Sequence, residues 1–161
     1  MGRVAILVDG NQIAHISGKR KPQGPVNPIK LLEKLCKGDV LVEAFWYQSI
    51  EPDESGKFAF LLDFVFGSYR VFLVRSEEIA ELYGRQVGDA FSLAYRYADA
   101  KIERIVLVNN NAALSDAVRE LRARQVLVEL ACFPAYGHEP AQRLLAAGGR
   151  RWELDAEDVF A

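Results

Sequence analysis

Short apolar runs that alternate with helix-like segments constrain the fold more than any other feature of this sequence. Five runs rich in β-branched residues have the continuous apolar character of strands buried on both faces. They span residues 4–8, 40–46, 71–74, 105–108 and 126–130, and a shorter run at 152–154 is a sixth candidate. Runs of this length are too short for helices, so each predicts one strand.

Between these runs, apolar side chains recur with helical spacing. The segments 28–37, 58–66, 90–97, 114–121 and 140–147 are predicted helices, the first of them opened by Asn27-Pro28 and closed by Gly38. Alternation of strand and helix predicts an α/β fold with a mostly parallel central sheet of five to six strands and helices on both faces. The length of 161 residues suits a single domain spanning residues 1–161.

Composition excludes several classes of protein. Twenty Lys and Arg against 22 Asp and Glu give a net charge of -2, so any nucleic-acid site must be a local patch. No apolar run approaches the ~20 residues that span a bilayer, so we expect no membrane association. Cys36 and Cys132 lie in apolar stretches and are interpreted as buried hydrophobes, which favours the reducing cytoplasm as the location.

Polar residues follow two of the predicted strands, where ligands bind in open α/β sheets. Asp9-Gly10-Asn11-Gln12 follows the first strand, and Asn109-Asn110-Asn111 follows the run at 105–108. Neither a GxGxxG fingerprint nor a Walker A lysine motif follows the first strand, which argues against a dinucleotide or P-loop site. Asn side chains at such a position cap helices, or bind phosphate, base edges or a metal through their carbonyl oxygen.

Two aspartates carry the metal hypothesis, and each has a second interpretation. Asp9 is either a capping residue at a strand-to-helix corner or a carboxylate that holds Mg²⁺ or Mn²⁺ at the mouth of the sheet. Gly88-Asp89 is predicted to open a helix, where a carboxylate is favoured by the helix dipole without any function.

Several segments together resemble the NYN domains of the PIN-like nuclease group. The segments that show this resemblance are Val4–Asn11 (VAILVDGN), 85–89 (RQVGD), 105–114 (IVLVNNNAAL) and 128–134 (VELACFP), and they occur in the family's order. The resemblance implies a PIN-like Rossmannoid fold. It also implies a carboxylate cluster that binds Mg²⁺ or Mn²⁺ and hydrolyses RNA phosphodiesters. Asp9 matches the first acid, Asn11 the motif Asn and Asp89 the middle acid.

The sequence also departs from the family pattern. The family's strand-end loop resembles Ser-Gly-Asp-Ser-Asp, but its two Asp positions hold Asn111 and Ala113, and Tyr95 stands where a further acid is common. Two missing carboxylates weaken cation binding and remove the expected general base. Asp116, further along the chain, is expected on the solvent side of its helix.

Two functions therefore stay open. The first is a metal-dependent endoribonuclease with Asp9 and Asp89 as catalytic metal ligands. The second is an inactive NYN relative that binds RNA or a protein. The nucleic-acid partner expected is single-stranded RNA, the alternative for the inactive relative is a protein partner, and a homodimer is a further expectation. The substrate-binding candidates are Asn11, Asn109, Asn110 and Asn111, together with the basic loop Lys19-Arg20-Lys21. The alternative interpretation of this loop is a solvated segment without a binding role. His15 is a candidate phosphate contact, whereas His138, in a Gly/Pro turn, is expected to be exposed.

Overall fold

The computed structural model describes residues 2–19, 25–51, 69–95, 101–155, 157 and 159. The predicted helix at 58–66 and the predicted RNA contacts Arg20 and Lys21 lie outside the described residues. Six strands form one sheet in the order β3-β2-β1-β4-β5-β6, and all neighbours are parallel. The strands are β1 Arg3–Asp9, β2 Val40–Ile50, β3 Arg70–Arg75, β4 Arg104–Val108, β5 Leu127–Cys132 and β6 Arg150–Glu153. The predicted parallel α/β sheet is thus confirmed, including its sixth strand.

The centre of the sheet is its most apolar part because helices cover it on both faces. From Val4 to Val8 every residue of β1 has 0% of its surface exposed, and β4 is buried along its whole length. The strand order reverses between these two strands, since β2 and β3 continue to one side and β5 and β6 to the other. Such a reversal leaves a crevice beyond the carboxyl ends of the two central strands.

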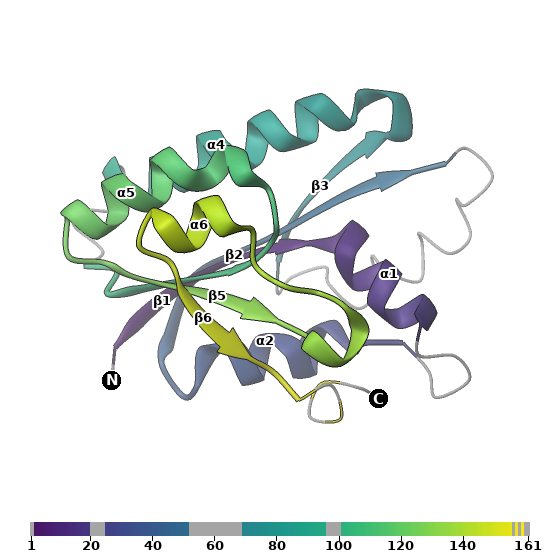
Figure 1. The fold of residues 1–161 in the computed structure, drawn as a ribbon, viewed down its shortest axis with the longest axis horizontal. Coiled ribbons are helices and arrows are strands. Elements are labelled where there is room, and N and C mark those ends of the chain that lie inside the picture. The colour runs from purple at the N-terminus through teal and green to yellow at the C-terminus, as the bar shows by residue number, and fades with distance from the viewer. Residues whose placement is uncertain are drawn as a thin grey trace.

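The helices divide between the two faces of the sheet (Figure 1). On one face, α1 (Gly10–Lys19) and α2 (Pro28–Cys36) pack on Val4, Ile6 and Val8. On the other face, α4 (Ile79–Tyr95), α5 (Ser115–Ala123) and α6 (Gln142–Ala146) pack on Ala5 and Leu7. Short 3-10 turns complete the described chain: η2 Ser76–Glu78, η4 Ala112–Leu114 and η5 Pro134–Tyr136. Side chains alternate along a strand, so Asp9 follows Ala5 and Leu7 on the α4 face.

One helix boundary differs from its prediction. The helix that Gly88-Asp89 was expected to open begins at Ile79, so Asp89 lies inside α4 rather than at its start. Leu82, Gln86 and Ala90 recur at i+4 spacing and are buried, so packing extends the helix through both Gly84 and Gly88. Each interior glycine costs about 1 kcal/mol relative to Ala, less than the buried apolar face contributes.

The amino end of the sheet is held by a buried ion cluster. Arg104 pairs with Glu129 at 2.9 Å and with Asp39 at 3.1 Å. Its guanidinium also donates to the carbonyls of Leu35 and Cys36, the last residues of α2. These carbonyls have no partner within the helix, so Arg104 supplies the C-terminal hydrogen bonds of α2 while it joins β4 to β5. The charged chemistry of this end is therefore structural.

Within the described part of the chain, no helix is long and apolar enough to cross a membrane.

Candidate functional site

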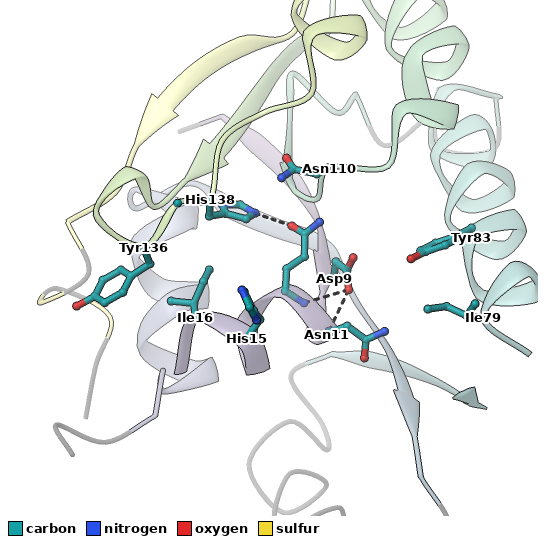
Figure 2. A pocket seen from close by; sticks show the side chains of 11 residues that line it. Asp9, Asn11, His15, Ile16, Ile79, Tyr83, Asn110, Tyr136 and His138 are labelled. Carbon is teal, nitrogen blue, oxygen red and sulfur yellow. Dashed lines mark hydrogen bonds between the residues drawn. The ribbon is translucent and has the colours of Figure 1, made fainter. Parts of the chain in front are cut away.

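A pocket of about 290 Å³ opens at the carboxyl edge of the sheet, beside the end of β1. The end of β1 and the helix α1 line it with Asp9, Asn11, Gln12, His15 and Ile16, and the loop after β4 contributes Asn110. Figure 2 shows the side chains of α4, Ile79 and Tyr83, on one side and Tyr136 with Ile16 on the other. The pocket thus lies at the point where the strand order reverses, as expected for this topology.

Asp9 caps the helix α1 and also lines the pocket. Its Oδ1 accepts hydrogen bonds from the backbone N–H groups of Asn11 at 2.9 Å and Gln12 at 3.4 Å, so it caps α1. It also lines the pocket, although only 4% of its surface is exposed. Burial raises the pKa of the Asp9 carboxyl to about 6, while the two backbone hydrogen bonds act in the opposite direction. Asp9 is therefore mostly ionised at pH 7.

Asn11 joins the start of α1 to the end of β2. Its Nδ2 donates to Ser49 Oγ at 3.0 Å, and its Oδ1 accepts from the Ser49 backbone N–H at 3.1 Å. The side chain lines the pocket, but both ends of its amide are already engaged. Asn11 therefore fixes the wall of the pocket.

The three consecutive asparagines have different roles. Asn109 and Asn111 both donate through Nδ2 to Gln86 Oε1 on α4, at 2.8 and 3.2 Å. The carbonyl oxygens of the same two amides accept from backbone N–H groups of the loop, so both side chains brace the loop against α4. Asn110 lines the pocket instead, and its Oδ1 is buried with no hydrogen-bond partner among the described residues. Of the three, only Asn110 is among the described residues that line the pocket.

The structure does not place Asp89 in the pocket. Its Oδ2 accepts a hydrogen bond from the Tyr47 hydroxyl at 2.8 Å and lies 3.5 Å from Arg85 Nε. Desolvation and the adjacent carboxylate raise the pKa of Tyr47, so the phenol remains a donor. Asp89 is thus held against β2 by two donors, about one helical turn beyond Gln86.

His138 is buried rather than exposed, which corrects the expectation from its Gly/Pro turn. The turn folds back so that Phe133 and His138 form an antiparallel bridge, and 6% of His138 is exposed. Burial lowers the pKa of His138 to about 4, so the imidazole is neutral at pH 7. Its Nδ1 accepts from the Phe133 backbone N–H, and Nε2 lies 2.5 Å from Gln12 Oε1. Since that oxygen can only accept, the proton is on Nε2.

The remaining candidates lie at the rim. His15 lines the pocket from the exposed side of α1. Lys19 ends α1, and its Nζ donates to the Tyr136 carbonyl at 2.9 Å, which ties the helix to the opposite wall. Asp116 is solvent-exposed and paired with Arg119, as expected from the sequence. Sequence reasoning did not single out Tyr83 or Tyr136, because they come from separate elements and no local motif joins them.

The residues present do not fit the metal centre that the family resemblance implies. Among the described residues no group of three or more His, Cys, Asp or Glu side chains could hold a metal ion. Asp9 is the one acidic residue that lines the pocket, and its Oδ1 is engaged in capping α1. Neutral amides of Asn109, Asn111 and Gln86 occupy the loop and helix beside it. Amides bring no charge to offset the desolvation of a divalent cation.

Comparisons with known proteins agree with this architecture. The family model of the NYN domain matches residues 3–149. A crystal structure of a protein of unknown function from Vibrio parahaemolyticus RIMD 2210633, VPA0982, superposes with a TM-score of 0.67. It shares 18% sequence identity, with 99% of this chain and 96% of that chain covered, so the likeness concerns the fold. No curated protein gives a significant sequence match.

Proposed function

We propose that this chain binds single-stranded RNA at the carboxyl edge of its sheet and that no two-acid metal centre cleaves the RNA there. The proposal starts from the family: the chain belongs to the NYN domain family, a PIN-like nuclease-type family. NYN nucleases act on RNA and generally depend on divalent metal ions. The observation that carries the proposal is the separation of the two acids. Asp9 lines the pocket, whereas Asp89 is held by Tyr47 and Arg85 outside its lining.

The chemistry of the pocket supports binding rather than hydrolysis. Asn110 and Gln12 offer neutral hydrogen-bonding groups, and Tyr83, which is 39% exposed, offers an aromatic face. Proteins that bind single-stranded RNA combine such hydrogen-bonding side chains with aromatic stacking platforms. Lys19 supplies a cation at the rim, where a backbone phosphate would pass. With a net charge of -2, non-specific electrostatic affinity is expected to be weak.

One observation keeps a metal-dependent ribonuclease as a second candidate. Asp9 retains a carboxylate at the switch point of the sheet, although Asn would cap α1 equally well. In this second candidate Asp9 and Asp89 would hold Mg²⁺ or Mn²⁺, and Asp89 would first have to leave Tyr47.

Binding and cleavage separate the two candidates. Binding is measured by fluorescence anisotropy of a labelled single-stranded RNA in EDTA, and cleavage of the same RNA is followed in Mn²⁺ and in Mg²⁺. Calorimetric titration with each metal is run on the wild type, on Asp9→Asn and on Asp116→Asn as an exposed acidic control. We expect RNA binding without cleavage and no saturable metal binding up to millimolar concentrations.

The other outcomes are equally informative. Metal-dependent cleavage that is lost in Asp9→Asn and retained in Asp116→Asn would establish the ribonuclease and refute the proposal. Absence of both RNA binding and cleavage would refute both candidates and leave a protein-interaction role.

A further inference from the structure

The pocket beside Asp9 has the dimensions and the polar groups of a site for one nucleobase. Small-molecule sites begin at about 300 Å³, so a pocket of about 290 Å³ suits a ligand of nucleoside size. Among the residues that the structure describes, its lining contains one carboxylate, Asp9, and no Lys or Arg. A phosphate group is therefore disfavoured inside the pocket, whereas an uncharged planar ring with hydrogen-bonding edges is compatible with it.

The orientation of the Gln12 amide is fixed by a chain of hydrogen bonds. The Phe133 N–H is shared between the His138 carbonyl at 3.1 Å and His138 Nδ1 at 3.3 Å. His138 Nε2 faces Gln12 Oε1, which can only accept, so the imidazole proton is on Nε2. Both N–H bonds of Gln12 are consequently directed away from His138, and Gln12 Nε2 has no acceptor among the described residues. Since Gln12 lines the pocket, it presents a pre-oriented donor to a ligand.

Two acceptors accompany this donor. Asp9 contributes its carboxylate, of which Oδ1 is engaged by α1 while no described residue donates to Oδ2. Asn110 contributes Oδ1, a buried acceptor without a partner, which is an unfavourable state that a donor on a ligand would relieve. Its terminal torsion is broad, so a rotation of the amide turns this oxygen toward the pocket that the residue lines.

We propose that the pocket takes one unpaired guanine of an RNA strand, with its Watson–Crick edge facing Gln12, Asp9 and Asn110. This inference rests on the proposed RNA binding. Guanine carries two adjacent donors, N1–H and the N2 amino group, next to one acceptor, O6. These match the two acceptors and the single donor of the pocket. Adenine and cytosine carry one donor group on this edge, and uracil carries one N–H between two acceptors, so each leaves an acceptor of the pocket unmatched.

The walls and the rim complete the arrangement. Tyr83 lies on the α4 side of the pocket, where its ring can stack on a base (Figure 2). Lys19 lies beside Gly137 at the opposite rim, because a Cβ on that glycine would be 3.3 Å from Lys19 Nζ. A base inside the pocket would thus leave its phosphate near this cation.

The test compares labelled uridine hexamers that carry one central guanosine, inosine, adenosine or cytidine, by fluorescence anisotropy in EDTA. For the wild type we expect the guanosine RNA to bind about 5- to 150-fold more tightly than the others, the range of one good bidentate contact. Inosine lacks the N2 amino group, so its weaker binding tests the two acceptors without any mutation. In Gln12→Met the preference for guanosine should fall, because the donor to O6 is lost while the acceptors of Asp9 and Asn110 remain. The control Gln142→Met, on the exposed side of α6, should retain the full preference.

Each other outcome has a definite meaning. Unmodified oligouridine is measured beside the four hexamers. Equal, measurable binding of all five RNAs would overturn the guanine inference and leave the RNA-binding proposal intact. Binding of inosine as tight as guanosine, or a guanosine preference that is undiminished in a folded Gln12→Met, would also overturn it. Absence of binding to every RNA would overturn both.

Discussion

Asp9 and His138 lie in one pocket and are expected to change stability with pH in opposite directions. Burial raises the pKa of Asp9 from 3.8 to about 6 and lowers the pKa of His138 from 6.5 to about 4. As the pH falls from about 6 to 3.8, folded Asp9 takes up a proton that the unfolded chain does not, so stability rises. As the pH falls from about 6.5 to 4, the unfolded chain protonates His138 and the folded chain does not, so stability falls.

The two contributions are similar in size. At 1.36 kcal/mol per pKa unit, each amounts to about 3 kcal/mol over its range. In the wild type they offset one another, so these two groups together leave the free energy of unfolding unchanged to within about 1 kcal/mol between pH 4 and 6.5. Removing either group should uncover the contribution of the other.

Urea unfolding at a series of pH values from 4 to 7.5 measures this directly. The stability of Asp9→Asn relative to wild type should be highest at pH 7 and fall by about 3 kcal/mol toward pH 4, because Asn keeps the cap without the buried charge. The relative stability of His138→Gln should rise by about 3 kcal/mol over the same descent. Other groups cancel in these differences. A flat difference for Asp9→Asn would show that Asp9 titrates like a solvated carboxyl and would refute the reasoning.

Three further predictions concern the framework around the pocket, and thermal or urea unfolding checks each of them. Gly10→Ala should lower the free energy of unfolding by about 1–3 kcal/mol, because the added Cβ would overlap the Trp46 indole nitrogen at the start of α1. Gly84→Ala, at a helical position where no neighbouring atom of the described residues lies within 4 Å of the added Cβ, should instead raise the free energy of unfolding by about 0.5–1 kcal/mol. A lower free energy of unfolding in this variant would contradict the placement of residue 84 inside a helix. Arg104→Met should cost up to about 3–5 kcal/mol, because buried Glu129 loses one of its two cations and keeps only Lys37, at 3.1 Å. Most of the loss should be recovered when Glu129→Met is added. An unrecovered loss would mean that the α2 carbonyls matter more than the ion pair.

Much of the sheet could be predicted because its strands coincide with uninterrupted apolar runs in the sequence. The central strands need no alternation, since helices cover both of their faces, and the run at 105–108 matches β4 closely. The helix α1 carries a weaker signal: in ten residues it contains Gly10 and Gly18, and its buried apolar side chains are only Ile13 and Ile16. The predicted start of α4 was wrong for a related reason. Glycines usually indicate a helix end, but packing holds the glycines of α4 inside the helix.

The candidate site was less accessible to sequence reasoning. The topological rule placed Asp9 and the Asn109-Asn110-Asn111 loop at the right edge of the sheet, but it could not tell which asparagine faces the pocket. The pairing of Gln12 with His138 spans 126 residues of sequence and depends on how one turn folds back. The tie between Asp89 and Tyr47 likewise depends on the packing of α4 on β2, which no local pattern reports.

The central position of β1 also has a consequence for how the chain is made. This strand precedes the other five in the chain and ends at Asp9, but one of its two neighbours, β4, begins only at Arg104. A nascent chain that has completed β2 and β3 can therefore pair only one side of β1. The other side keeps its backbone N–H and C=O groups unpaired, in a strand whose side chains are all apolar from Val4 to Val8. Such non-local parallel pairing is slow to form, and exposed edges of this kind favour association between chains. Arrival of β4 at the ribosome exit closes that edge and, in the same step, forms the crevice in which the pocket lies.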